Sequence, residues 1–81
     1  MGYHQKQIKK GVLGTVSKIT EEYEEFMDGV SQNNPVLMLV ELTDLLGAIE
    51  QFTVKNYNIN LQDLVKMKDC TESAFLDGSR S

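Results

Sequence analysis

Apolar residues recur at helical spacing in three segments of this chain, and two polar breaks separate those segments. The first segment runs from Thr15 to about Ser31, the second from Val36 to about Lys55, and the third from Leu61 to Asp77. In the first break, Asn34 suits the N-cap of the following helix and Pro35 suits its first turn. The pattern predicts an all-α fold whose helices are joined by short loops.

Residues at the other segment ends support these boundaries. Asn60 precedes Asp63 by three residues, which resembles a capping box at the start of the third helix. Gly78 suits the left-handed position that ends a helix. Gly47 lies inside the Leu-rich second segment, where glycine costs about 1 kcal/mol relative to alanine. We therefore expect a close helix crossing at Gly47.

The chain is short for a protein that folds alone. Residues 1–14 are expected to form an irregular N-terminal arm, and residues 15–81 a single helical domain. A domain of this size buries only about 60% of the surface that its unfolded chain exposes. Because Cys70 is the only cysteine, an internal disulfide is excluded. Three helices do not bury all their apolar faces, so we expect a homodimer or homotetramer that completes a four-helix-bundle-like core.

The charge and hydropathy of the chain restrict its partners. Its formal net charge of −4 argues against nucleic acid as a partner and favours cations. The longest apolar run, Val36 to Val40, is far shorter than the roughly 20 residues that span a bilayer, and the first residues are polar. A cytoplasmic protein without a membrane partner is the expectation.

Acidic residues crowd the first predicted helix. Glu21, Glu22, Glu24 and Glu25 occupy four of five consecutive positions. Such a cluster is most often a solvated helix face. At about 100° per residue, however, Glu22 lies at the edge of the apolar arc. At least one carboxylate is therefore expected to lean towards the core.

The second predicted helix carries two acids in apolar company. Glu41 and Asp44 are one turn apart, on the stripe that also holds Leu37, Leu45, Ala48 and Phe52. Buried carboxylates usually pair with cations or coordinate metals. Lys55 is the only cation on this stripe, and at 1.5 Å rise per residue it lies about 16 Å from Asp44. We therefore expect no side chain nearby to neutralise these acids.

A divalent cation can compensate them. If the first two helices pack antiparallel, Glu22 and Glu25 face Glu41 and Asp44 across the groove. Oxygen-only ligands suit Mg²⁺ or Mn²⁺, which keep waters that phosphate oxygens can replace. The sequence therefore predicts a metal site of four carboxylates between these two helices.

The order and spacing of the acids resemble a known signature. Glu21-Glu22-x-x-Glu25, then fifteen intervening residues, then Glu41-x-x-Asp44 is similar to the motif of the MazG-like all-α nucleoside triphosphate pyrophosphohydrolases. The flanking residues resemble those of short, single-domain, phage-type members, for which the location would be the cytoplasm of the host. The resemblance covers nearly the whole chain.

This resemblance implies a reaction and a set of roles. The reaction is Mg²⁺-dependent hydrolysis of a nucleoside or deoxynucleoside triphosphate between its α and β phosphates, which releases the monophosphate and pyrophosphate and serves nucleotide-pool control. The four predicted ligands would hold Mg²⁺, with Mn²⁺ as a substitute. Glu21, Glu22 and Glu25 would be the catalytic carboxylates, and Glu21 would hold a further metal or orient the attacking water.

Cations and aromatic residues are candidates for contacts to the nucleotide. The candidates for phosphate binding are Lys18, Lys55, Lys68 and Arg80. Those for the base are Tyr3, His4, Phe52 and Tyr57, among which the sequence does not choose. Since His4 is the only histidine, we expect no histidine-based metal site or relay, and we expect His4 to be a surface residue of the arm.

A function from another class fits the same composition. The chain could be a non-enzymatic acidic helical dimer that acts as an interaction module, or an inactive relative of the enzymes. Glu41 and Asp44 on an apolar stripe argue for the enzyme, because an interaction module gains nothing from desolvating two charges.

Overall fold

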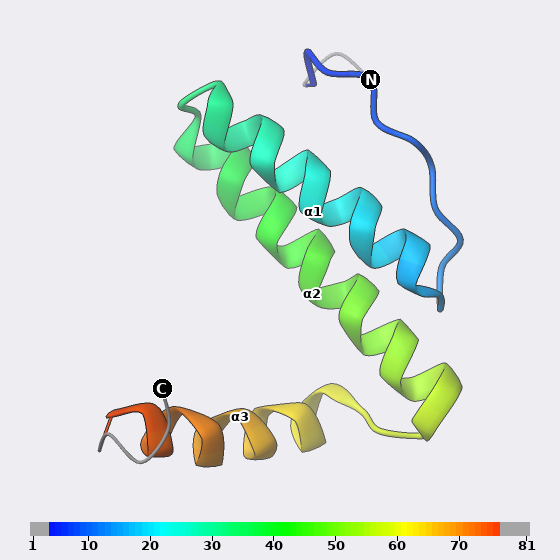
Figure 1. Ribbon diagram of the computed structural model, residues 1–81, viewed down its shortest axis with the longest axis vertical. Coiled ribbons are helices and arrows are strands. Elements are labelled where there is room, and N and C mark those ends of the chain that lie inside the picture. Colours follow the sequence, from blue (N-terminus) through cyan, green and yellow to red (C-terminus); the bar gives the residue numbers. More distant parts are fainter. Residues whose placement is uncertain (1–3, 77–81) are drawn as a thin grey trace.

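The computed structural model describes residues 4–76, and within this range the regular secondary structure consists of helices alone, without strands. The helices are α1 (Val16–Ser31), α2 (Pro35–Tyr57) and α3 (Leu61–Leu76) (Figure 1). The predicted all-α fold and the three helical segments are confirmed. The predicted end of the third helix at Asp77 and its stop at Gly78 lie outside the described residues.

Local capping fixes the ends of α2 and the start of α3. The Asn34 side chain accepts a hydrogen bond from the backbone N–H of Leu37 at 3.1 Å, as predicted for an N-cap. Asn58 ends α2 in the left-handed conformation, at φ 55°. Asn60 and Asp63 form the predicted reciprocal cap, with backbone N–H to side-chain distances of 2.9 and 3.2 Å.

Helices α1 and α2 form an antiparallel pair (Figure 1), and they are tightly packed at Gly29. A Cβ atom placed on Gly29 would lie 3.4 Å from the side chain of Leu37 and from the backbone of Met38. At Gly47 a Cβ atom would meet no other described atom within 4 Å. The predicted close crossing at Gly47 is therefore wrong within the described chain, because the small residue that admits the neighbouring helix lies on α1.

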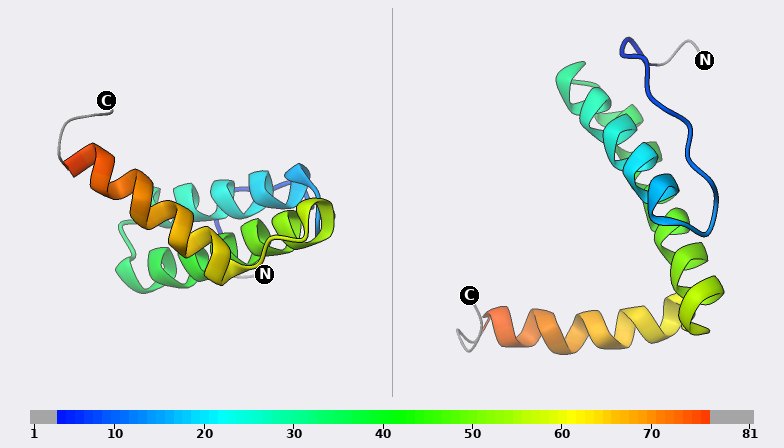
Figure 2. Two further views of the ribbon diagram at one scale, coloured as in Figure 1. Left: turned by 90° about the horizontal axis from the view of Figure 1, so that it is seen from below. Right: turned by 45° about the vertical axis from the view of Figure 1, so that its right-hand side comes forward.

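Helix α3 leaves the pair and runs across the end of α2 (Figures 1 and 2). Its start is tied to α2, because the Glu50 carboxylate accepts a hydrogen bond from the Leu61 N–H at 3.0 Å. The Thr53 hydroxyl donates to the Ile59 carbonyl at 2.8 Å. The angle between the helices encloses a hollow of about 470 Å³, lined by Leu46, Ile49, Leu61, Leu64, Val65 and Lys68.

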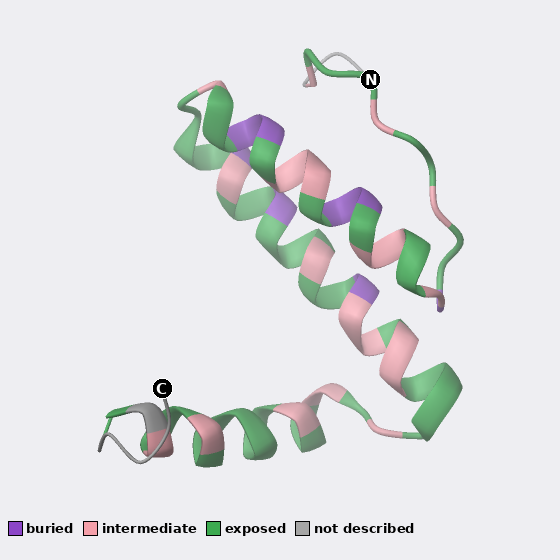
Figure 3. Ribbon diagram, viewed as in Figure 1, coloured by how far each residue is buried: buried purple, intermediate pink, exposed green. Residues whose placement is uncertain are grey.

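The described part of the chain buries more acidic than apolar side chains. Its buried apolar residues are Leu37 and Ala48, whereas its buried charged residues are Glu21, Glu22, Asp28 and Glu41. Figure 3 shows buried residues on α1 and α2 and none in the described part of α3. Large apolar side chains remain exposed on α2, among them Val36 at 72% and Leu39 at 65%. Such a chain has little apolar core of its own.

The N-terminal arm runs beside α1 and is hydrogen-bonded to it (Figures 1 and 2). The backbone N–H of Gln5 donates to Asp28 at 3.1 Å, and that of Gly11 donates to Glu21 at 2.9 Å. Gly14 ends the arm at φ 89°, a conformation that glycine adopts without strain. The arm is therefore attached to acidic side chains of α1 near both of its ends.

None of the helices in the described residues has the length and apolarity that crossing a bilayer requires. The longest, α2, carries acidic side chains at Glu41, Asp44 and Glu50.

Candidate metal centre

The α1–α2 pair brings the four predicted metal ligands into one space. Carboxylate oxygens of Glu22, Glu41 and Asp44 lie within 4.8 Å of one another. A carboxylate oxygen of Glu25 lies within the same distance of an oxygen of Glu22, and likewise of an oxygen of Glu41. We call these four residues the acidic cluster. The spacings i, i+3 on each helix and the antiparallel packing together produce this convergence.

Two oxygens of the acidic cluster have no hydrogen-bond partner among the residues that the structure describes. Glu22 is 5% exposed and Glu41 is 4% exposed, yet Oε1 of each is buried and unpaired. A buried carboxylate oxygen without a donor is costly, and such atoms in proteins usually bind a donor, a water or a cation. The two unpaired atoms belong to residues of facing helices, which favours a cation between the helices.

The Glu25 carboxyl keeps its proton to a higher pH than an ordinary glutamate does. Burial and the charge of Glu22 raise the pKa of the Glu25 carboxyl to about 7, and Glu41 adds to the effect. Because a cation ligand must be deprotonated, a metal that binds here displaces this proton.

Asp44 lies at the rim of the cluster. It is exposed and lines a hollow of about 400 Å³ together with Glu22, Lys18 and Gly47. A second hollow of about 420 Å³ is lined by Asp44, Glu41 and His4. Solvent and ligands can therefore approach the cluster from both sides of Asp44.

Lys18 supplies a cation beside the acidic cluster, where the sequence predicted a phosphate contact. Its ammonium lies 3.0 Å from both Glu21 Oε1 and Glu22 Oε2. Hydrogen bonds to these two carboxylates raise the pKa of Lys18 to about 12. Lys18 therefore offsets charge at Glu22, one turn further along α1. The expectation that no side chain nearby offsets Glu41 and Asp44 is wrong for Glu41, because the His4 imidazole lies 2.9 Å from its carboxylate.

Glu21 is buried and amply hydrogen-bonded. It accepts from the Gly11 N–H at 2.9 Å and from Lys18 at 3.0 Å, and Lys10 lies 3.5 Å away. Burial alone raises the pKa of Glu21, but the Gly11 and Lys18 donors outweigh it and lower that pKa to about 2. An oxygen of Glu21 lies within 4.8 Å of Glu22 and Glu25, so it borders the acidic cluster. Its contacts make it an anchor for the arm.

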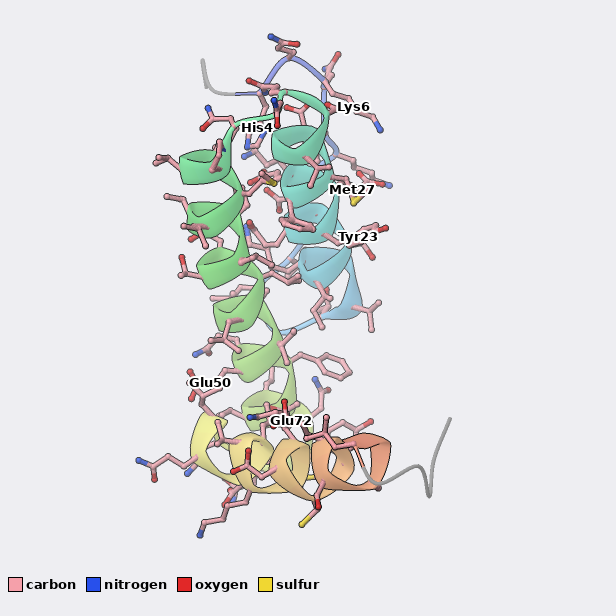
Figure 4. All side chains as sticks on the ribbon, turned by 90° about the vertical axis from the view of Figure 1, so that its left-hand side faces the viewer. His4, Lys6, Tyr23, Met27, Glu50 and Glu72 are labelled. Atoms are coloured by element: carbon pink, nitrogen blue, oxygen red, sulfur yellow. The ribbon has the colours of Figure 1, made fainter. Side chains whose placement is uncertain are left out.

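His4 lies against the acidic cluster, where the sequence analysis expected a surface residue. Its Nε2 is 2.9 Å from Glu41 Oε2 and 3.7 Å from Glu25 Oε1, and its side chain is 13% exposed. Figure 4 shows His4 at the end of the helix pair where α1 gives way to α2. Helical periodicity carries no information on where an irregular arm lies, so the sequence held no signal for this contact.

Asp28 holds the other side of the imidazole. Its Oδ2 is 2.9 Å from His4 Nδ1 and accepts hydrogen bonds from the Gln5 N–H and the Gln32 amide. Burial alone raises the pKa of Asp28, but the hydrogen bonds from His4 and Gln32 lower it. A signal for Asp28 did exist, because it follows Glu25 by three residues and so shares its helix face.

The remaining predicted nucleotide contacts lie elsewhere. The Lys55 side chain packs against Gly14, since a Cβ atom placed on Gly14 would lie 2.6 Å from Lys55 Cδ. Lys68 pairs with Asp69 at 2.7 Å and with Glu72 at 3.8 Å, both on α3. Phe52 and Tyr57 pack edge to face with ring centres 5.9 Å apart. Of the other candidates, Arg80 and Tyr3 lie outside the described residues.

No family model, curated protein or solved structure matches this chain. The motif and the geometry of the acidic cluster are therefore the grounds for a functional proposal.

Proposed function

We propose that the protein is a MazG-like nucleoside triphosphate pyrophosphohydrolase that cleaves its substrate between the α and β phosphates in the presence of Mg²⁺. One observation carries this proposal. Glu22 Oε1 and Glu41 Oε1 are buried and unpaired, and they belong to acidic residues from two facing helices. A cation satisfies both atoms, and the spacing of the four acids resembles the signature of these enzymes.

The residues of the acidic cluster would hold Mg²⁺, and Mn²⁺ could replace it. Bound there, the cation would neutralise the triphosphate and polarise the phosphoryl centre. It would also lower the pKa of a bound water enough for that water to act as the nucleophile. Lys18 lines the same hollow as Glu22 and Asp44, which supports a contact between its ammonium and a phosphate oxygen. Phosphoryl chemistry of this kind depends on positioning and charge stabilisation, and it needs no protein nucleophile.

We also propose that the active form is a homodimer or homotetramer with a four-helix core. The support is the exposed apolar surface of α2, which includes Val36, Leu39, Val40 and Leu46. A second chain that covers this surface would supply the core that the protomer lacks. A nucleoside triphosphate substrate would place the reaction in the cytoplasm.

The test is product identification. A panel of ribo- and deoxyribonucleoside triphosphates is incubated with the protein and Mg²⁺, and the products are identified by ³¹P NMR. Monophosphate plus pyrophosphate supports the proposal, whereas orthophosphate plus diphosphate, or no turnover of any substrate, refutes it. Glu41→Gln should abolish turnover and leave the fold intact. Glu24→Gln is the matched control, because Glu24 belongs to none of the ligand groups in the described chain.

A non-enzymatic acidic module is the second candidate, and one observation favours it. Lys18 and His4 already compensate part of the cluster charge. Under this alternative, the thermal midpoint shows only a general salt effect when Mg²⁺ is added. Under the enzyme proposal it rises with Mg²⁺ concentration, because the cation binds the folded state alone.

A further inference from the structure

We propose that His4, Glu25 and Glu41 form a second, mixed nitrogen–oxygen site for a divalent first-row transition metal, with Asp28 as its positioning residue. This inference rests on the proposed function, because it adds a cation next to the one held by the acidic cluster. The N-terminal arm, which brings the only histidine of the chain to this place, thereby becomes part of the metal centre.

The ligand atoms are already close together. One nitrogen of His4 and one oxygen each of Glu25 and Glu41 lie within 4.8 Å of one another. His4 Nε2 and Glu41 Oε2 are 2.9 Å apart. Metal–ligand distances of about 2.0–2.2 Å place neighbouring ligand atoms roughly 3 Å apart. A metal ion can therefore take the place of the proton that these two atoms share.

Asp28 orients the imidazole for this role. Its Oδ2 is 2.9 Å from Nδ1, and since an ionised carboxylate only accepts, Nδ1 carries the hydrogen. With Nδ1 keeping its hydrogen, the nitrogen left for a metal is Nε2, which would bind it in place of the proton that lies between Nε2 and Glu41 Oε2. Asp28 is fixed in turn by the Gln5 N–H at 3.1 Å and the Gln32 amide at 2.9 Å. A carboxylate that holds the distal nitrogen of a histidine is the usual support of a metal-bound imidazole.

Glu41 is shared by the acidic cluster and the second site. It is 4% exposed, and its Oε1 is buried without a hydrogen-bond partner although Oε2 contacts His4. Glu41 belongs to two ligand groups, one with His4 and Glu25 and one with Glu22 and Asp44. Its two oxygens can therefore serve two cations, as bridging carboxylates do in two-metal sites.

The donor set selects the metal. Mg²⁺ favours oxygen ligands alone, whereas imidazole suits transition metals. The hollow lined by His4, Glu41 and Asp44 gives such an ion access to the site and room for waters. We therefore expect Mn²⁺ to bind more tightly than Mg²⁺, and the difference to come from His4.

The test uses Mn²⁺ alone as the probe and the full chain without a histidine tag. Since His4 is the only histidine, imidazole-nitrogen modulation in the pulsed EPR spectrum of bound Mn²⁺ reports this residue. The modulation should be present in the wild type and absent in His4→Gln. The Mn²⁺ dissociation constant should rise at least about tenfold in His4→Gln, and about 10-fold to 100-fold in Asp28→Asn, which keeps the modulation. Lys6→Gln, an exposed cation of the same arm, is the control and should match the wild type.

Three results overturn the inference: Mn²⁺ bound without nitrogen modulation, Mn²⁺ bound equally well by His4→Gln, or no Mn²⁺ bound. The wild-type spectrum decides the question even if a variant fails to fold. Pyrophosphate release with Mg²⁺ is measured separately. Turnover without a histidine–metal bond therefore rejects the second site and keeps the proposed function, whereas a lack of turnover rejects the function itself.

Discussion

The Lys18 ammonium lies 3.0 Å from Glu22 Oε2, one helical turn away on α1, so the acidic cluster contains an internal cation. The pair satisfies one oxygen of Glu22 and leaves Oε1 buried without a partner. Lys18 therefore compensates the cluster charge in part, and an added cation still has an unpaired oxygen to bind. Lys18 should therefore contribute to the stability of the metal-free fold, whereas Glu22 Oε1 should contribute to the affinity for metal.

Lys18→Met tests these two expectations. Removing the ammonium leaves Glu21 and Glu22 buried without their shared donor. The loss of hydrogen bonds to charged groups should lower the free energy of unfolding by about 1–3 kcal/mol without metal. Mg²⁺ should then raise the thermal midpoint more than it does in the wild type. Urea unfolding and thermal melting, with ionic strength matched by NaCl, measure both effects.

Lys66→Met is the control for this substitution, because Lys66 is an exposed cation on α3. It should change neither the metal-free stability nor the response to Mg²⁺ by more than a few tenths of a kcal/mol. Equal losses in both variants would show that the ion pairs of Lys18 contribute nothing specific.

The helices could be predicted from the sequence because their signals are local. Asn34 caps α2 through its own side chain, and Asn60 and Asp63 cap α3 through contacts three residues apart. The close approach of the helices depends on which faces meet, which is not a local property. For that reason the sequence suggested Gly47, whereas the structure has the contact at Gly29.

The convergence of the acidic cluster could also be predicted from the sequence, because the spacing of its acids within each helix is local. Glu22 with Glu25, and Glu41 with Asp44, are each one turn apart, so a single assumption of antiparallel packing brings them together. The contact of His4 with Glu41 spans 37 positions and involves an arm without periodicity. No pattern in the sequence encodes such a contact.

The metal-free protein should lose stability as the pH rises through neutrality. The pKa of Glu25 is raised from 4.5 to about 7 by burial and by neighbouring carboxylates. Burial alone lowers the pKa of His4, but hydrogen bonds to Asp28 and Glu41 outweigh it and raise that pKa above 6.5. Both groups bind their protons more tightly in the folded state, so the stability they give is complete below the unfolded pKa and is lost above it.

Urea unfolding at a series of pH values measures this loss. The free energy of unfolding should fall between about pH 4.5 and 7 through Glu25, and further above 6.5 through His4. Glu25→Gln should flatten the lower part of the curve. Mg²⁺ affinity should rise over the same range, because the cation displaces the Glu25 proton. A stability that increases from pH 5 to 7 without metal contradicts the assignment of the raised pKa to Glu25.

Association should depend on the exposed apolar surface of α2. Leu39 is 65% exposed, and Val36 beside it is 72% exposed. Leu39→Glu places a charge where a second chain would cover the helix, which costs far more in an interface than in water. The wild type should sediment as a multiple of 9.1 kDa, and the variant should dissociate towards that mass and lose stability.

Gln62→Glu is the matched control for Leu39→Glu, because it adds the same charge at an exposed polar position of α3. It should leave the sedimentation profile unchanged. A monomeric wild type with a cooperative unfolding transition would refute the proposed four-helix core.

Of the adjacent glutamates Glu21 and Glu22 on α1, Glu22 alone should be required for metal binding. Glu21 accepts hydrogen bonds from Gly11 and Lys18, so it anchors the arm, whereas Glu22 keeps a buried oxygen without a partner. Glu21→Gln should destabilise the metal-free protein by about 1–3 kcal/mol, since the Lys18 pair is weakened, and retain the rise of the thermal midpoint with Mg²⁺. Glu22→Gln should abolish most of that rise, because it removes a ligand. Melting curves over a Mg²⁺ titration distinguish the two, and the reverse result would make Glu21 the ligand.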